Sequence, residues 1–210
     1  MRIGITMRTA RDAATGEVRD AIDRDWWRFL SIALPGDILF PVANHPASAE
    51  AFFRSAALDG LILTGGDDIG SSPERDATEG ALLDACAPGD LPVLGICRGL
   101  QFLSSKHGAA IVPCDPESHR SKRHGLRLDH DLAPRALRGL TEVNSYHNLS
   151  VRLPRDSRLR AWAWSADGCV EGVSLPGTRT LAIGWHPERE STPRPEDIAL
   201  FRTHFHGETA

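Results

Sequence analysis

The sequence predicts an α/β fold in which parallel strands alternate with helices in the first half of the chain, and antiparallel or mixed strands follow in the second half. Short β-branched apolar runs alternate with longer amphipathic segments up to about residue 96, which is the pattern of a doubly wound parallel sheet. Beyond residue 110, brief strands separated by turn residues replace this pattern.

The first expected strand is IGITM at 3–7. A helix is expected to follow it, because apolar residues recur at three- and four-residue spacing from Val18 through Ile22 and Trp26 to Ala33. Asp20, Asp23 and Trp26 would then belong to one amphipathic helix. The other elements expected in this half are strands at 37–43, 60–66 and 91–96, and helices at 47–57, 72–86 and 98–106.

The second half is expected to hold short strands and one helix. The strands are AIVP at 110–113, HGLRL at 124–128, TEVNS at 141–145, RAWAWS at 160–165, GCVEGVS at 168–174 and TLAIGW at 180–185. Asp167 and Gly168 mark a hairpin between two of them. A final helix at 195–206 begins with a proline and carries Ile198, Phe201 and Phe205 on one face.

The composition favours a single globular domain over residues 1–210. Of the 210 residues, 41% are hydrophobic and 25% are charged, which suits one full-sized core better than two. The formal net charge of −4 provides no basic excess for binding a nucleic acid polymer or an anionic membrane. We therefore expect a small-molecule partner, and the sequence leaves the oligomeric state open.

Cysteine usage and the N-terminal segment indicate a cytoplasmic protein. The N-terminus lacks the apolar run of a signal peptide, and no later stretch reaches the roughly 20 apolar residues that span a bilayer. Cys86, Cys97, Cys114 and Cys169 lie far apart without a C-x-x-C pair, a spacing that suits neither a disulfide framework nor a zinc ribbon. In a reduced compartment a lone thiol is available for catalysis.

The strongest local motif is LPVLGICRGLQ at 91–101, in which a buried strand passes through Cys97 directly into a helix. A nucleophile at so tight a turn needs small residues two positions away on either side, and Gly95 and Gly99 provide them. The N-terminus of the helix lowers the pKa of the thiol, and the backbone N–H of Arg98 can donate to an oxyanion. We interpret Cys97 as a nucleophile; the alternative is a cysteine packed at the end of a core strand.

A thiolate needs a proton acceptor, and His186 in TLAIGWHPE has the most informative setting of the nine histidines. Pro187 restricts the backbone after it. Glu188 is expected on the same side of an extended segment, where its carboxylate would hold the imidazole in the tautomer that accepts the thiol proton. Alone, this motif would suit an ordinary turn, but together with Cys97 it predicts a Cys-His-Glu arrangement.

A third motif, LILTGGDD at 61–68, brings paired glycines to the same carboxyl edge of the sheet as Cys97. Glycines there leave backbone N–H groups exposed. We expect Gly66 to be the oxyanion donor opposite Arg98, and Gly65 to contribute to substrate binding. Asp67 and Asp68 are expected to cap the following loop.

Residues 114–130 form the only strongly basic stretch, with Arg120, Lys122, Arg123 and Arg127 among three histidines. Two interpretations remain open. The segment is either a solvated loop, or it lies beside the active site and binds an anionic part of the substrate, because guanidinium groups bind phosphate and carboxylate bidentately.

TGGDD, GICRGLQ, VNSYHN and WHPE together resemble the class I glutamine amidotransferase superfamily, in the family's order and over nearly the whole chain. The resemblance implies an α/β, flavodoxin-like fold with a mixed, mainly parallel sheet flanked by helices and with added antiparallel strands in the C-terminal half. It also implies attack of a cysteine on the γ-carbonyl of a glutamyl group and hydrolysis of the resulting thioester. Cys97, His186 and Glu188 would be the triad, with no metal and no cofactor.

The same resemblance implies that Gln101 and the segment Asn144, Ser145, Tyr146 and His147 bind the amino-acid end of the glutamyl group. Two of these residues have an alternative explanation in the fold alone. Gln101 would also suit a polar contact of its helix, and Tyr146 would suit packing at a strand end.

Two branches of the superfamily compete. Amidotransferase subunits usually carry an apolar residue and then G-H-Q after the cysteine, whereas RGLQ at 98–101 and DGCVEGVS at 167–174 are similar to stand-alone γ-glutamyl hydrolases. EVRDAIDRDWWRFL at 17–30 and WHPERE at 185–190 resemble the small γ-glutamyl-CDP-amidate hydrolases. We therefore expect a hydrolase of a small γ-glutamyl amide. If the second resemblance holds, the amine half of the substrate carries an anionic or nucleotide part. The alternative is a glutaminase subunit that supplies ammonia to a synthase; a non-catalytic descendant is disfavoured by the complete triad.

Overall fold

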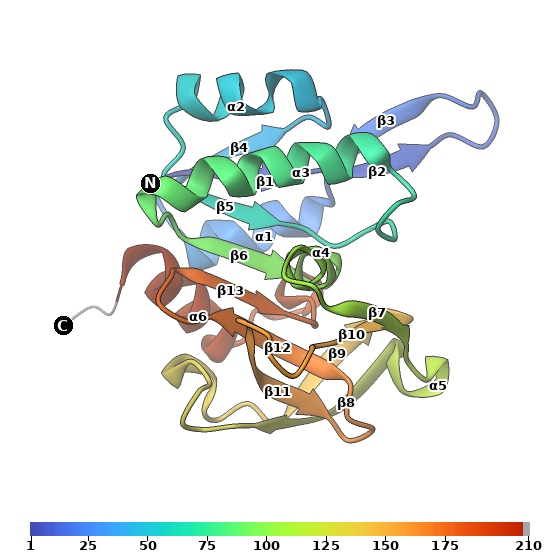
Figure 1. The fold of residues 1–210 in the computed structure, drawn as a ribbon, viewed down its shortest axis with the longest axis vertical. Helices are drawn as coiled ribbons and strands as arrows, with labels where there is room; N and C mark the ends of the chain where they lie inside the picture. The colour runs from blue at the N-terminus through green and yellow to red at the C-terminus, as the bar shows by residue number, and fades with distance from the viewer. Residues whose placement is uncertain (208–210) are drawn as a thin grey trace.

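The computed structural model describes residues 1–207 and is built around a nine-stranded sheet (Figure 1). The strand order is β4-β1-β5-β6-β13-β12-β11-β8-β9. Strands from β4 to β13 run parallel to their neighbours, and those from β13 to β9 run antiparallel. The strands are β1 (Arg2–Thr6), β4 (Ile38–Val42), β5 (Gly60–Leu63), β6 (Val93–Ile96), β8 (Arg120–Leu128), β9 (Glu142–Tyr146), β11 (Arg160–Ser165), β12 (Val170–Leu175) and β13 (Thr180–Ile183). The predicted fold class is confirmed.

Helices cover both faces of this sheet, and two smaller two-stranded sheets lie beside it. The helices are α1 (Arg24–Ala33), α2 (Pro46–Ser55), α3 (Pro73–Cys86), α4 (Arg98–Lys106), α5 (Pro116–His119) and α6 (Pro195–His206), with 3₁₀ turns η1 (Ala87–Gly89), η2 (Arg135–Leu137) and η3 (Pro187–Arg189). The small sheets pair β2 (Arg8–Arg11) with β3 (Val18–Ala21) and β7 (Ala110–Pro113) with β10 (Leu149–Arg152).

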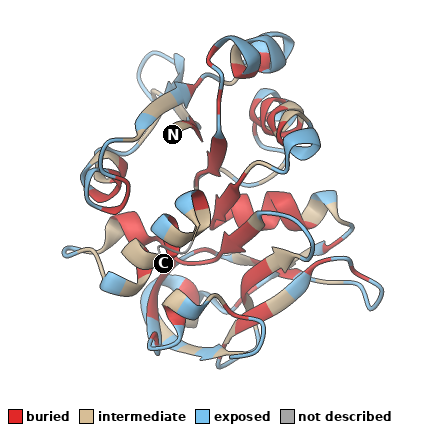
Figure 2. Cartoon of the chain, turned by 90° about the vertical axis from the view of Figure 1, so that its left-hand side faces the viewer, coloured by how far each residue is buried: buried red, intermediate tan, exposed pale blue. Residues whose placement is uncertain are grey.

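The hydrophobic core is divided by the sheet into two parts. Strand β5 contributes to both, because successive side chains of a strand point to opposite faces. Leu61 and Leu63 pack with the apolar residues of α2, α3 and α4, whereas Ile62 packs with those of α1 and α6. Figure 2 shows the result: the central strands are buried, and the exposed residues lie on the outer helices, the loops and the outlying strands.

Most elements expected from hydrophobic periodicity are confirmed. The helices expected at 98–106 and 195–206 are α4 and α6 with those bounds. The predicted hairpin at Asp167 and Gly168 joins β11 to β12, and Gly168 has the positive φ of +88° that such a turn favours. Phe201 and Phe205 are buried, as the predicted face of the last helix requires.

The predicted helix from Val18 is wrong over its first part. Val18–Ala21 is strand β3, which pairs with β2, and Val18 is 52% exposed. The helix begins after Asp23, whose carboxylate accepts a hydrogen bond of 2.9 Å from the backbone N–H of Asp25. Asp20 lies in β3 rather than on a helix and accepts hydrogen bonds from Asn44. The helical spacing of apolar residues continued by chance into the β2–β3 hairpin. The N-cap residue Asp23 marks where the helix begins.

The basic stretch 114–130 is more regular than a solvated loop. It contains α5 and the nine-residue strand β8, which pairs with both β9 and β11. Within residues 1–207, no helix combines the length and the apolar character needed to cross a membrane.

Candidate active site

Cys97 lies at a strained turn between β6 and α4. Its φ of +53° and ψ of −101° are unusual for a residue other than glycine, and such strain is typical of functional sites. A Cβ atom added to Gly99 would lie 2.4 Å from the carbonyl oxygen of Leu63, and one added to Gly95 would lie 2.8 Å from the backbone of Gly99. The tight strand-to-helix turn predicted from these two glycines is confirmed.

His186 follows β13 and is held by Glu188. Nδ1 of His186 lies 2.6 Å from Oε1 of Glu188, and both side chains are buried. The backbone between them is the 3₁₀ turn η3 rather than the extended segment that we expected. Because Nδ1–H donates to the carboxylate, Nε2 is left as the proton acceptor.

The electrostatics of this pair favour an ionised thiol. Burial acts to raise the pKa of the Cys97 thiol, but the charge and hydrogen bond of His186 outweigh it, so this pKa lies below its usual value. Burial acts to lower the pKa of His186, but the carboxylate of Glu188 and the thiolate of Cys97 raise that pKa to about 10. The two groups stabilise each other as a thiolate and an imidazolium.

The loop of Gly65 and Gly66 lies against these two side chains. A Cβ atom at Gly65 would lie 2.7 Å from Cε1 of His186 and 3.6 Å from Cβ of Cys97. Gly66 has a φ of +130°, which favours glycine. Buried Arg75 donates hydrogen bonds of 2.8 and 3.1 Å to the carbonyls of Thr64 and Gly65, and thereby fixes the loop.

The side chain of Arg98 belongs to the support of the site. It is buried and forms ion pairs with Glu79 and Asp76. Glu79 also binds Arg75 at 3.0 Å and accepts a hydrogen bond of 2.8 Å from Thr6. One buried carboxylate therefore links the helix after Cys97 to the arginine that holds the glycine loop. The role predicted for Arg98 involves its backbone N–H, at the first residue of α4.

Two residues predicted to bind substrate have partners within the fold. Nε2 of Gln101 donates a hydrogen bond of 2.8 Å to the carbonyl of Leu149. Asn144 bonds both backbone groups of His186: its Oδ1 accepts from the N–H at 2.8 Å, and its Nδ2 donates to the carbonyl at 2.8 Å. Asn144 thus positions the histidine from the middle of β9.

Ser145, Tyr146 and His147, which were also predicted to bind substrate, lie in different surroundings. Tyr146 is 40% exposed, and its ring lies edge-on to His186 with 5.5 Å between centroids. Ser145 and His147 are buried away from solvent. His147 lies 3.2 Å from Oε1 of Glu171 through Nε2 and belongs to a separate polar cluster.

Two adjoining hollows lie beside the buried pair. One, of about 260 Å³, is lined by the β2–β3 hairpin, the start of α1, the Gly65–Gly66 loop, and His186. The other, of about 300 Å³, reaches Cys97 and Tyr146. Arg8 and Arg189 line both, and Arg189 stacks on the ring of Tyr146 at 4.4 Å. Neither arginine was among the residues predicted from the sequence, although the position of Arg189 directly after Glu188 is a signal for it.

The basic stretch contributes other contacts. Arg123 forms ion pairs with Glu142 at 2.6 Å and with Glu190 at 3.0 Å. Arg127 stacks on Trp164 at 4.4 Å. Neither of the two hollows is lined by a residue of 120–127 among the residues that the structure describes.

Comparison with known families identifies the chain. The family model described as Peptidase C26 matches residues 2–188 of the chain. The chain belongs to the Peptidase C26 family. This family is class I glutamine amidotransferase-like, so the predicted superfamily is confirmed, and this Peptidase C26 protein is a glutamine amidotransferase-like amide hydrolase.

Named relatives of this Peptidase C26 protein include two hydrolases. It is 28% identical over 200 residues to the gamma-glutamyl-CDP-amidate hydrolase of Campylobacter jejuni, covering 91% of this chain and 92% of that one. It is 32% identical over 204 residues to the gamma-glutamyl-gamma-aminobutyrate hydrolase of Escherichia coli O157:H7, with coverage of 80% and 78%. The crystal structure of a glutamine amidotransferase from Thermotoga maritima has the same fold, with a TM-score of 0.66 at 14% identity, covering 96% of this chain and 82% of that one.

Proposed function

We propose that this protein hydrolyses the γ-glutamyl amide bond of a small-molecule conjugate, with Cys97 as nucleophile, His186 as base and Glu188 as the residue that orients the histidine. The observation that carries the proposal is the buried histidine at the cysteine elbow, held by a carboxylate 2.6 Å away. The two related hydrolases named above support a γ-glutamyl substrate.

The reaction has two steps. The thiolate Sγ atom of Cys97, whose proton Nε2 of His186 has already accepted, attacks the γ-carbonyl carbon. His186 then donates this proton to the leaving nitrogen, the C–N bond breaks, and the amine departs from a γ-glutamyl thioester. In the second step a water molecule transfers a proton to His186 and attacks the thioester carbon; the C–S bond breaks and glutamate is released. The backbone N–H groups of Gly66 and Arg98 stabilise the oxyanion in both steps.

The amine half of the substrate is proposed to carry an anionic group, of which a diphosphate-linked nucleotide is one example. Support comes from Arg8 and Arg189, which line both hollows beside His186, one of which also reaches Cys97. Within residues 1–207, the ion pair of Arg8 is a long one of 3.5 Å to Asp67, and the side chain of Arg8 is 49% exposed. A guanidinium group with free donors binds phosphate or carboxylate well.

The decisive experiment measures glutamate release by the purified chain from a panel of γ-glutamyl conjugates of γ-aminobutyrate, a polyamine, a peptide and a nucleotide phosphoramidate, with free glutamine included. Turnover of one conjugate, with little hydrolysis of glutamine, is the expected result. Replacement Cys97→Ala should abolish release while the thermal unfolding transition is kept. Full activity of this variant would overturn the proposal. Silence of the wild type toward every conjugate, relieved by a synthase partner, would instead identify a glutaminase subunit.

The anionic preference has its own test. Loss of one charge-assisted hydrogen bond costs about 1.5–3 kcal/mol, so Arg189→Ala should raise KM about 10- to 100-fold for an anionic conjugate and leave a neutral one nearly unchanged. Arg54→Ala is the matched control, because Arg54 is exposed on α2 and pairs with Glu50. Equal effects of Arg189→Ala on both conjugates would contradict the role in charge recognition. The proposed reduced, cytoplasmic location accords with the free thiols of all four cysteines, which lie within residues 1–207.

A further inference from the structure

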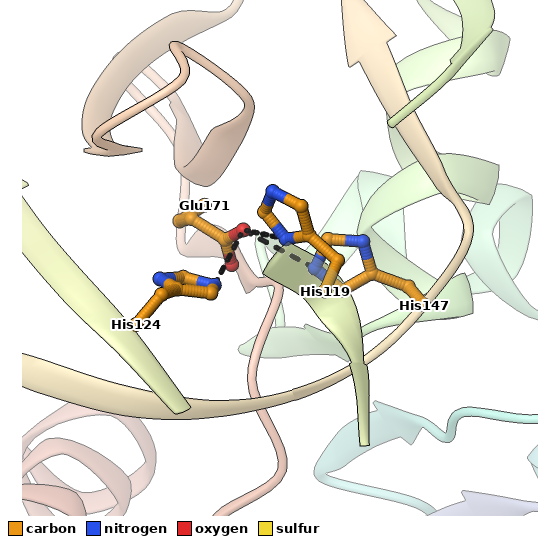
Figure 3. A group of neighbouring side chains, drawn as sticks. All are labelled: His119, His124, His147 and Glu171. Atoms are coloured by element: carbon orange, nitrogen blue, oxygen red, sulfur yellow. Dashed lines mark hydrogen bonds and ion pairs between the residues drawn. The ribbon is translucent and has the colours of Figure 1, made fainter. Parts of the chain in front are cut away.

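Three histidines and one glutamate converge in the antiparallel half of the molecule, in a cluster that the proposed reaction does not use. His119 ends α5, His124 lies in β8, His147 lies between β9 and β10, and Glu171 lies in β12. Figure 3 shows the three imidazoles pointing toward the carboxylate of Glu171. His119, His147 and Glu171 are buried, and the side chain of His124 is 9% exposed.

The distances from Glu171 to the three histidines fit those between ligands of a tetrahedral metal. Oε1 of Glu171 lies 3.2 Å from Nε2 of His147, 3.4 Å from Nε2 of His124 and 3.6 Å from Nδ1 of His119. Two tetrahedral ligands that each lie about 2.0–2.1 Å from zinc are about 3.3 Å apart. The four ligand atoms all lie within 4.8 Å of one another. By contrast, two of the three separations are too long for strong direct hydrogen bonds.

The outer ring nitrogens of two histidines already have acceptors. Nε2 of His119 lies 3.0 and 3.1 Å from the two carboxylate oxygens of Asp167. Nδ1 of His124 lies 3.1 Å from the carbonyl oxygen of Gly125. A neutral imidazole that donates its single N–H outward presents a lone pair on the other nitrogen. In that neutral tautomer both inner nitrogens would face Glu171 as acceptors, the arrangement in which metal-bound histidines are held by a carboxylate or a carbonyl.

The third histidine, His147, contacts the sulfur of Cys114, and the hydroxyl of Ser145 contacts His119. Nδ1 of His147 lies 3.4 Å from Sγ of Cys114. Oγ of Ser145 lies 3.3 Å from the inner Nδ1 of His119. Within residues 1–207, Nε2 of His124 and Oε2 of Glu171 are buried without a hydrogen-bond partner. Acceptor atoms that face one another in a buried space repel unless a proton or a metal ion lies between them.

We propose that His119, His124, His147 and Glu171 bind a divalent transition-metal ion, zinc in the first instance. Three imidazoles and one carboxylate suit zinc, whereas magnesium and calcium favour sites made of oxygen atoms alone. Four protein ligands fill a tetrahedral shell, which makes this a closed, structural site. The reaction proposed for Cys97 does not pass through it.

The position of the site gives it a structural role beside the active site. It joins α5, β8, β12 and the segment after β9. That segment directly follows Tyr146, which contacts His186, and β9 also carries Asn144, which bonds the backbone of His186. A bound metal would thus hold one side of the active site in place.

The experiment measures metal binding by the full chain, independently of hydrolysis. A Cys97→Ser background prevents binding at the nucleophile. The protein is stripped with a chelator and titrated with Zn²⁺, and Co²⁺ is used as a spectroscopic substitute. We expect about one equivalent to bind, a rise in Tm of about 5–10 °C at a hundredfold excess of Zn²⁺ over Kd, and the intense visible bands of tetrahedral Co²⁺. His124→Asn should abolish all three effects, and His130→Asn, at an exposed histidine of the same basic stretch, should abolish none.

Several outcomes would overturn the site. A stripped chain that stays folded and takes up neither Zn²⁺ nor Co²⁺ would do so. Strong thiolate-to-cobalt charge-transfer absorption would also do so, because it would place a cysteine among the ligands. Should His124→Asn fail to fold, Glu171→Gln and the titration of the Cys97→Ser protein still decide the question. A stripped chain that unfolds and regains its structure only with Zn²⁺ would support the proposal.

Discussion

Replacement of Gly99 by alanine tests whether close approach of α4 to the sheet determines the cysteine elbow. The added Cβ would lie 2.4 Å from the carbonyl oxygen of Leu63 and 2.9 Å from its Cβ. Real Cβ atoms essentially never come closer than 3.0 Å to a neighbour, so this contact is 0.6 Å too short. Two of the clashing atoms are backbone atoms of Leu63, at 2.4 and 3.1 Å. They cannot rotate away, and α4 and β5 must separate.

The sign of the stability change distinguishes this clash from helix propensity. Alanine favours a helix over glycine by up to about 1 kcal/mol, so propensity alone would stabilise the protein. Overpacking typically costs about 1–3 kcal/mol, which for a chain of this size corresponds to a decrease in Tm of about 2–12 °C. Because Cys97 is two residues away, a displacement approaching 1 Å should also lower kcat/KM by about 100-fold.

Thermal unfolding and glutamate release measure the two effects on the same sample. Gly125→Ala is the matched control, because a Cβ there meets nothing closer than the carbonyl oxygen of Thr141 at 3.9 Å. It should change neither quantity much. If Gly99→Ala is as stable as the wild type and equally active, the reasoning from close approach is refuted.

Three further predictions concern the support of the site and its charge. Glu79→Ala should lower the free energy of unfolding by about 3–5 kcal/mol in urea titrations, because two buried arginines lose their shared carboxylate; a loss below about 1 kcal/mol would contradict this. A thiol with a lowered pKa stays ionised at lower pH, so alkylation of Cys97 should remain rapid below the ordinary thiol range near about 8.5. His186→Gln should move the pH profile of Cys97 alkylation to higher pH, while Cys86, whose pKa burial raises to about 12, stays unlabelled. An unmoved profile would exclude His186 as the cause of the lowered pKa of Cys97. Asp23→Ala should remove the N-cap of α1 and cost about 1 kcal/mol in the same urea titrations, and no change would show that the cap is dispensable.

Local patterns were sufficient for much of the fold. The strands of the parallel half are short apolar runs, and α4 and α6 begin and end where glycine, proline and periodicity indicate. These features depend on neighbouring residues, so they can be recognised in one sequence. The error at Val18–Ala21 has the opposite origin. This strand exists because it pairs with Arg8–Arg11, and periodicity carries no information about a pairing partner.

The sequence by itself determined the elements that bear the proposed chemistry: a cysteine between two glycines, paired glycines after a strand, and a histidine two residues before a glutamate. Each is a short motif whose geometry is set by the backbone around it. Only the tertiary structure decided which residues surround them. In the folded chain, Arg8 and Arg189 line the hollows beside His186, and Asn144 binds the backbone of His186. Three histidines and Glu171, from four separate segments, come together in one cluster. Such contacts join residues far apart in the chain, and their distances follow from sheet order and helix packing rather than from local spacing.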